Sequence, residues 1–294
     1  MASTSQRARE RAEARRREIA ERQQAEARRR LLLRIFLPIA LVVVVVAVFV
    51  VVKVTGGGGD EAAPGVLASG AAPAAVVQDV TTVPAADFDT VGAGSDVTGP
   101  TPIADGTALT GDGKPKVLYV GGEFCPFCAA ERWVVVASLA RFGTFTGLSQ
   151  TNSSADDVHP NTATLSFHGA TYESNYLTFA GYETTDRDRK TLDTLPVDDQ
   201  QVYDTLNPDG TIPFQDLGGK FTQSGASFDP TVLADKTHAQ IAAAINDPGS
   251  DIGKAVLAAS NRYTARLCEL TDGQPGDVCS SSGVKAAASA LAGS

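Results

Sequence analysis

Residues 117–133 have the sequence VLYVGGEFCPFCAAERW, and this stretch decides the fold. It opens with Val117–Val120, a short apolar run rich in β-branched and aromatic residues, which predicts a buried strand. Gly121 and Gly122 then predict a tight turn. A Cys-x-x-Cys pair follows, at the head of a long segment of Ala, Val and Leu that favours a helix. The stretch therefore predicts a strand, a turn and a helix, with two cysteines at the junction.

The two cysteines are Cys125 and Cys128, and the residues between them are Pro126 and Phe127. Pro126 suits the first helical position, because its missing N–H would have no partner there. The sulfur of Cys125 is then expected at a helix N-terminus, where unpaired N–H groups and the helix dipole favour a thiolate. Cys128 follows one turn later, close enough to form a disulfide with Cys125. The pair predicts redox chemistry, with a structural disulfide or half of a zinc site as the alternatives.

Several residues around the pair are candidates for a supporting role. Glu123 lies just before the cysteines and is a candidate for proton transfer. Arg132 would favour a thiolate and Glu131 would oppose one, although both side chains also suit a solvent-exposed face. The helix is expected to run to about Phe142, with Gly143 as a left-handed stop.

The chain has 294 residues and a formal net charge of −9, but its charges are divided unevenly. Residues 1–34 contain 11 Arg against 5 Glu, whereas the chain from Thr55 onward contains 13 Lys and Arg against 29 Asp and Glu. Two regions of opposite charge indicate two compartments. The four cysteines are too few for a disulfide scaffold.

Residues 35–54 are predicted to form a transmembrane helix. Ile35–Val52 is apolar except for one proline, is flanked by Arg34 and Lys53, and would span about 27 Å. A cleavable signal peptide is the competing interpretation, but the long basic segment before the run and the lack of a nearby small-x-small site argue against it. The positive-inside rule places residues 1–34 in the cytoplasm. We therefore expect a single-pass protein of the cell membrane whose main domain is extracytoplasmic.

The position of the basic segment before the apolar run explains its charge, so no nucleic-acid partner is expected. Residues 55–76 are rich in Gly, Ala, Pro and Ser and predict a flexible linker. The folded domain is expected to cover residues 77–290.

The segment after the first helix predicts mainly β-structure. We expect a second strand over Thr144–Gln150 and a hairpin-like insertion formed by Thr162–Gly169 and Tyr176–Tyr182. His159 and His168 lie in this segment, and neither has metal-ligand spacing to another His or to the cysteines. No metal and no cofactor are predicted.

The C-terminal part predicts helices and a second cysteine pair. Thr237–Ile245 favours a helix, with His238 in its first turn facing solvent. In an oxidising compartment, Cys268 and Cys279 predict a structural disulfide that stabilises by about 3 kcal/mol in the chain-entropy model. A resolving or relay role for this pair is the alternative, and a four-Cys zinc site matches the spacing poorly. The tail from Ser280 is expected to be frayed.

Thr211-Ile212-Pro213-Phe214, a β-branched residue and a proline at the start of a predicted strand, resembles the cis-proline loop of thioredoxin-like proteins. The resemblance implies a cis bond that brings the backbone of Ile212 beside the two cysteines. That backbone would pair with an extended substrate chain, and Pro213 would keep a metal from joining the sulfurs. A hairpin over residues 214–223 is expected to follow.

The CPFCAAERW run, Arg141-Phe142-Gly143, the Ile-Pro dipeptide and the late cysteine pair together resemble one family. Its members are membrane-anchored thioredoxin-like proteins catalogued as a domain of unknown function, number 929 of that series. The resemblance covers roughly residues 80–290. It implies an α/β fold with a mixed sheet flanked by helices, a β-rich insertion between the second core strand and the cis-Pro loop, and an extra C-terminal helix.

The family has no settled substrate, but the Cys-x-x-Cys site and the expected topology together predict a membrane-anchored thiol–disulfide oxidoreductase that acts on exported proteins. Cys125 and Cys128 would carry the exchange and Ile212 and Pro213 would bind the client, with Pro126, Phe127 and Glu123 in support. One alternative is a reductase for haem attachment, which would need electrons from a membrane redox partner. The other is a non-catalytic thioredoxin-like binding module with structural disulfides.

Overall fold

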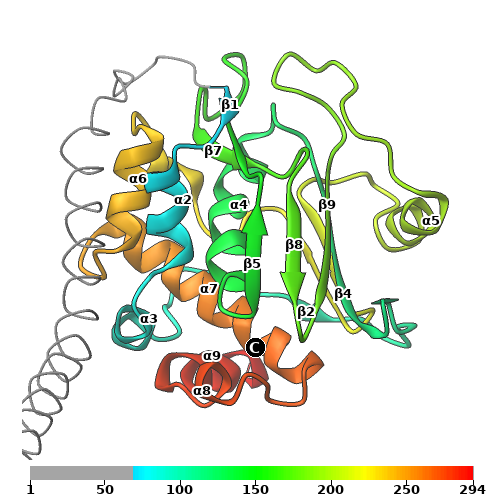
Figure 1. Ribbon diagram of the computed structural model, residues 1–294, viewed down its shortest axis with the longest axis vertical. Helices are drawn as coiled ribbons and strands as arrows, with labels where there is room; N and C mark the ends of the chain where they lie inside the picture. Colours follow the sequence, from blue (N-terminus) through cyan, green and yellow to red (C-terminus); the bar gives the residue numbers. More distant parts are fainter. Residues whose placement is uncertain (1–68, 294) are drawn as a thin grey trace, which may run out of the picture. The chain divides into compact units, whose positions relative to one another are not determined.

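The central sheet is built on β4 (Lys114–Gly121), shown in the computed structural model of Figure 1. The structure describes residues 69–293. The predicted cytoplasmic segment 1–34, the transmembrane segment 35–54 and most of the linker lie outside the described residues. Within residues 69–293, none of the helices has the length and apolar character needed to cross a membrane.

The sheet is mixed, as the sequence predicts. Its strands, in order across the sheet, are β2 (Thr101–Pro102), β11 (Phe221–Ser224), β10 (Phe214–Leu217), β4 and β9 (Thr178–Glu183). β4 runs antiparallel to β10 and parallel to β9. A short strand, β3 (Thr110–Gly111), forms a hairpin with the start of β4 through Asp112 and Gly113, both at positive φ.

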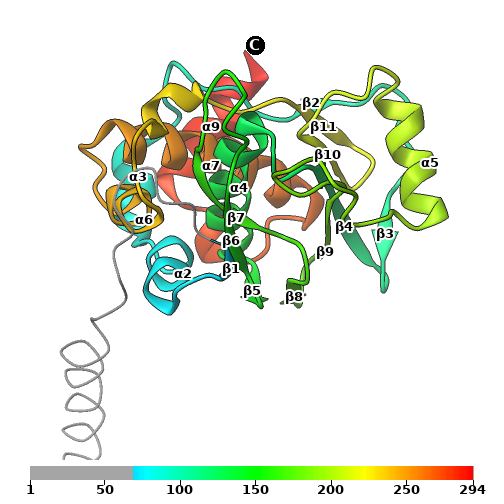
Figure 2. The ribbon, with the colours of Figure 1, turned by 90° about the horizontal axis from the view of Figure 1, so that it is seen from above.

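Successive side chains of β4 point to opposite faces of the sheet. Because both sets are apolar, helices cover both faces. Val117 and Tyr119 pack into the larger core, on the side of α4 (Pro126–Leu139) and α7 (Asp251–Leu270). Leu118 and Val120 pack toward α5 (Val197–Leu206) on the other side. Figures 1 and 2 show α5 apart from the other helices, across the strands. The structure is therefore a mixed α/β fold with helices on both sides of the sheet.

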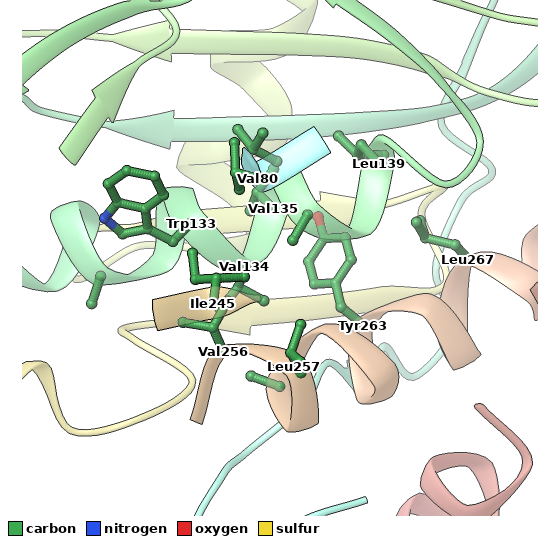
Figure 3. Close-up of a cluster of buried hydrophobic side chains, with 14 of the residues drawn as sticks. Val80, Trp133, Val134, Val135, Leu139, Ile245, Val256, Leu257, Tyr263 and Leu267 are labelled. Carbon is green, nitrogen blue, oxygen red and sulfur yellow. The ribbon is translucent and has the colours of Figure 1, made fainter. Parts of the chain in front are cut away.

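α4 is the central helix of the larger core. All of its residues except Phe127 are buried, including the charged Glu131 and Arg132. Figure 3 shows Trp133, Val134, Val135 and Leu139 of α4 among side chains from helices that lie far apart in the sequence. Those neighbours are Val80 of α2 (Ala74–Thr81), Ile245 of α6 (His238–Ile245) and Val256, Leu257, Tyr263 and Leu267 of α7.

The order of the strands after α4 differs from the predicted one. They are β5 (Gly143–Thr146), β6 (Ser149–Asn152), β7 (Ala163–Ser166) and β8 (Thr171–Ser174). β5 pairs with β8, and β6 pairs with β7 and with β1 (Gly70–Ala71), so none joins the central sheet. The parallel neighbour of β4 is instead β9, and the β-rich insertion precedes this strand rather than following it. A parallel pair requires a long crossover, which α4 and the insertion provide.

Two local expectations were also wrong. Gly143 is not a left-handed stop but opens β5, where a Cβ would lie 2.3 Å from the carbonyl oxygen of Glu173. The tail from Ser280 is not frayed, because α9 (Ser282–Ala292) buries Val284, Ala287 and Leu291. These three residues recur at helical spacing.

The remaining elements are α3 (Ala85–Val91), α8 (Gly276–Cys279) and a 3₁₀ helix, η1 (Pro230–Leu233). β1 and the start of α2 lie within the segment that the sequence assigned to the linker. His238 does not face solvent as expected. It is 7% exposed, and its Nε2 lies 2.8 Å from the carbonyl oxygen of Thr151 and 3.1 Å from the amide nitrogen of Thr164.

Candidate functional site

Cys125 and Cys128 lie where the turn after β4 leads into α4. Cys125 is the N-cap of the helix, and Pro126 occupies the first helical position. The N–H of Cys128 donates a hydrogen bond to Sγ of Cys125 across 3.2 Å, because it belongs to the first turn and has no helical partner. Both thiols are free; Cys125 is 5% exposed, and Cys128 is fully buried.

The two thiols differ in acidity. A hydrogen bond from the Cys128 side chain lowers the pKa of Cys125 below its ordinary value, with help from the backbone N–H groups of Cys128 and Phe127 and from Arg132. Burial, by contrast, raises the pKa of Cys128 well above its ordinary value. Cys125 is therefore the thiol that ionises first, and Cys128 stays protonated behind it.

Ile212 and Pro213 lie beside Cys125. β10 begins at Phe214, which pairs with Val120 near the end of β4. This pairing places the loop before β10 next to the cysteines that follow β4. The Ile212–Pro213 peptide bond is cis. The carbonyl oxygen of Ile212 accepts a hydrogen bond from the thiol of Cys125, with 3.8 Å between O and Sγ. The structure thus brings together Cys125, Cys128 and the Ile-Pro dipeptide.

Phe127 lies between the two cysteines in the chain, and Glu123 precedes them by two residues. Phe127 is 39% exposed, and its ring meets the ring of His159 edge to face, with 5.7 Å between the centroids. Glu123 is half-buried and accepts a hydrogen bond from the hydroxyl of Thr151 at 3.3 Å. Phe127 is thus an exposed large apolar side chain in the first turn of α4.

Arg132 is fully buried, not in solvent. Its guanidinium binds both carboxylate oxygens of Glu183, with Nε–Oε1 at 2.7 Å and Nη2–Oε2 at 2.6 Å. Nη2 also donates to the carbonyl oxygen of Gly122 in the turn before the cysteines, at 2.7 Å. Glu183 ends β9, the parallel neighbour of β4. A buried ion pair therefore connects α4 to β9 behind the cysteines.

Glu131 is fully buried as well. Its carboxylate accepts hydrogen bonds from Nε2 of Gln215 at 2.9 Å and from the N–H and Oγ–H of Ser227 at 2.8 and 3.0 Å. Burial raises the pKa of Glu131 to about 7. Gln215 follows the cis-proline loop by two residues, so this acid links α4 to that strand.

Sequence reasoning missed Glu183 and Tyr119 as parts of this site. Tyr119 is fully buried in β4, and Arg132, Cys128 and Glu183 all act on its hydroxyl electrostatically. The adjacent Glu131 and Arg132, inside an otherwise apolar helix, were the available signal, because a buried charge needs a partner of opposite charge. No local pattern identified Glu183 as that partner.

Cys268 and Cys279 form a disulfide at the other end of α4, with Cα atoms 5.6 Å apart. Arg141, just past the end of α4, donates to Oγ of Ser281, two residues after Cys279, at 3.4 Å. The helix between the two cysteine pairs is about 20 Å long. In the described part of the chain, no group of three or more His, Cys, Asp or Glu side chains is arranged to hold a metal ion.

No curated protein and no solved structure matches the chain. The family predicted from the CPFCAAERW run does match, over the segment that carries both cysteines, Arg132 and Glu183. The match ends before the Ile-Pro dipeptide. Residues 103–210 thus correspond to the family described as a domain of unknown function, DUF929.

Proposed function

We propose that the protein is a thiol–disulfide oxidoreductase with a thioredoxin-like fold. The observation that carries this proposal is the arrangement of two free thiols, one at the N-cap of α4 beside the cis Ile212–Pro213 bond and the other buried in the first turn, which divides their acidity. Cys125 has a lowered pKa at the start of α4, and the buried Cys128 has a raised one. An exchange catalyst needs this difference, because one sulfur must attack a client and the other must wait for the intermediate.

The topology supports the thioredoxin-like assignment. α4 follows β4, the parallel strand β9 follows the insertion, and the antiparallel hairpin of β10 and β11 comes last. The cis bond before β10 lies next to the first cysteine. The resemblance to thioredoxin-like proteins implies this combination of a mixed sheet, a Cys-x-x-Cys helix and a cis-proline loop.

In the reductive direction, the Cys125 thiolate attacks one sulfur of a client disulfide. A bond forms between Cys125 and that sulfur, and the second client sulfur leaves with the electron pair and takes up a proton from solvent. The Cys128 sulfur then attacks Cys125, the mixed disulfide breaks, and the proton of Cys128 passes to the released client sulfur. The site becomes a disulfide and the client becomes a dithiol; the oxidative direction is the reverse.

The client would bind along the loop that precedes β10. Pro213 has no N–H, and the half-buried Ile212 offers its backbone beside Sγ of Cys125. An extended client chain that pairs with Ile212 would bring its own sulfur in line with the pair. Phe127 supplies an exposed apolar contact for the residues next to that sulfur.

The proposed setting is the outer side of the cell membrane, with residues 35–54 as the anchor and exported proteins as clients. The disulfide between Cys268 and Cys279 supports an oxidising compartment, because such bonds persist there and are rare in the cytosol.

The test measures the reduction potential of the full-length chain, together with insulin reduction and RNase refolding. We expect turnover in one of the two assays, loss of turnover in Cys125→Ser, and trapped client adducts in Cys128→Ser. The double variant Cys268→Ser with Cys279→Ser is the matched control and should keep turnover. A potential below about −300 mV without turnover would instead indicate a structural disulfide in a binding module.

A further inference from the structure

Two hydrogen-bond donors behind the cysteines have no acceptor. They are Nη1 of Arg132 and the hydroxyl of Tyr119, both in fully buried side chains within the described residues. Buried polar groups are nearly always paired, so an unpaired donor needs an explanation. Two such donors next to a proposed redox pair point to a charge that appears only during the reaction.

Both donors lie against the active-site turn. Arg132 follows Cys128 by four residues, so the two side chains share one face of α4. Its Nη2 already holds the carbonyl oxygen of Gly122 in the turn. A Cβ on Gly121 would lie only 2.7 Å from Oη of Tyr119, which places this hydroxyl directly beneath the same turn.

The surroundings of Cys128 explain why its sulfur needs help to ionise. It is fully buried, and burial and the Glu183 carboxylate both oppose a negative charge there, while Arg132 favours it. The ionisable groups that act on Cys128 or respond to it are Cys125 and Arg132 on α4, Glu183 on β9, Tyr119 on β4 and Tyr203 on α5. Arg132 is the cation of this set.

We propose that Tyr119 and Arg132 are positioning residues for the resolving step, holding the Cys128 thiolate with their unpaired O–H and N–H donors. This inference rests on the proposed function. A thiolate is a much stronger acceptor than a neutral thiol, so the two donors would act on Cys128 once it ionises. Donors fixed in advance, in a fully buried site, stabilise a developing charge most effectively.

The step balances within the mixed disulfide. Cys128 loses its proton, its sulfur attacks the sulfur of Cys125, and the bond between Cys125 and the client breaks. The electron pair leaves on the client sulfur, which takes up the proton. Tyr119 and Arg132 neither gain nor lose a proton; they stabilise the charge on Cys128 before its attack.

The experiment follows the reaction of the mildly reduced full-length chain with 5,5′-dithiobis(2-nitrobenzoate). Thiolate attack by Cys125 releases one thionitrobenzoate and leaves the other as a mixed disulfide. Attack by Cys128 then releases the second, and its rate is measured against pH. Cys128→Ser should give only the first release.

Tyr119→Phe removes one hydroxyl and keeps the ring. We expect the second release to slow about tenfold at neutral pH, the loss of one hydrogen bond to a charged group, and its pH profile to move to higher pH. The first release should not change. Tyr182→Phe is the matched control, because its hydroxyl binds Asp199 on the α5 side of the sheet, and it should leave both releases unchanged.

Arg132→Lys, which keeps the charge but loses the planar fork, should also slow the second release, provided that circular dichroism shows a native fold. An unchanged pH profile in Tyr119→Phe would overturn the inference, as would equal slowing of both releases. If the unaltered protein gives no first release, the proposed function itself fails, so the two failures are distinguishable.

Discussion

The two cysteine pairs lie at opposite ends of α4 and in opposite positions on their helices. Cys125 caps the start of α4, where free N–H groups stabilise a thiolate. Cys268 lies in the last turn of α7, and Cys279 is the last residue of α8, where the negative end of the dipole opposes one. One pair is free and divided in acidity, and the other is joined. The helix dipole therefore favours a thiolate at Cys125 and disfavours one at Cys268 and Cys279.

The end of α4 that carries the free thiols also contains a fully buried ion pair. Arg132 and Glu183 form an ion pair with no exposed side-chain surface. The cost of removing two charges from water can exceed the gain from their attraction, so a buried ion pair adds little net stability. Its position behind Cys128 explains its presence better than packing does.

The largest predicted effect near the start of α4 is the loss of stability caused by Glu183→Gln. This substitution leaves the buried charge of Arg132 without its partner, and we expect the free energy of unfolding to fall by about 3–5 kcal/mol in urea denaturation. Asp188→Asn, which breaks an exposed pair with Lys190, is the control and should change stability by less than about 1 kcal/mol. Equal effects of the two variants would show that the buried pair has no special role.

Glu131 makes the stability of this end depend on pH. Because its pKa in the folded protein is raised to about 7, the folded state binds a proton that the unfolded state has already lost. Stability from this group is therefore present at acid pH and lost as the pH rises toward 7, by a total on the order of 3 kcal/mol. Glu131→Gln should flatten this part of the curve of unfolding free energy against pH. An unchanged curve would contradict the assignment.

At the other end of α4, the double variant Cys268→Ser with Cys279→Ser should lose about 3 kcal/mol of stability, measured by urea denaturation. The rate at which Cys125 is alkylated should not change, because the disulfide lies a helix length away. A slower alkylation of Cys125 would mean that the two ends are coupled.

The smallest predicted effect is Cys128→Ala. It removes the side-chain hydrogen bond that contributes most to the lowered pKa of Cys125. The midpoint of Cys125 alkylation against pH should therefore move to higher pH, while the backbone N–H of residue 128 keeps part of the stabilisation. A midpoint that stays in place would assign the effect to the helix terminus alone.

The sequence predicts the local parts of this site well and the non-local parts poorly. A strand, a turn and a capped helix follow from neighbouring residues, and the hairpin of β10 and β11 follows from Gly218 and Gly219, both at positive φ. The parallel partner of β4 does not. β9 lies beyond α4 and four more strands, and its partly buried residues resemble those of a surface hairpin.

The predicted positions of several charged and polar side chains were wrong for the same reason. Glu131, Arg132 and His238 were compatible with solvent because such side chains are usually exposed. Their partners, Ser227, Glu183 and the backbone of Thr164, come from distant segments. Only the folded chain shows that each of these groups is paired.

The most direct measurement is the pH dependence of Cys125 alkylation in the mildly reduced full-length protein, read by mass spectrometry. We expect Cys125 to be modified first, with a midpoint below the value of about 8.5 for a free cysteine, and Cys128 to be protected. An inert Cys125, or a midpoint at or above that of a free thiol, would contradict a redox role for this end of the helix.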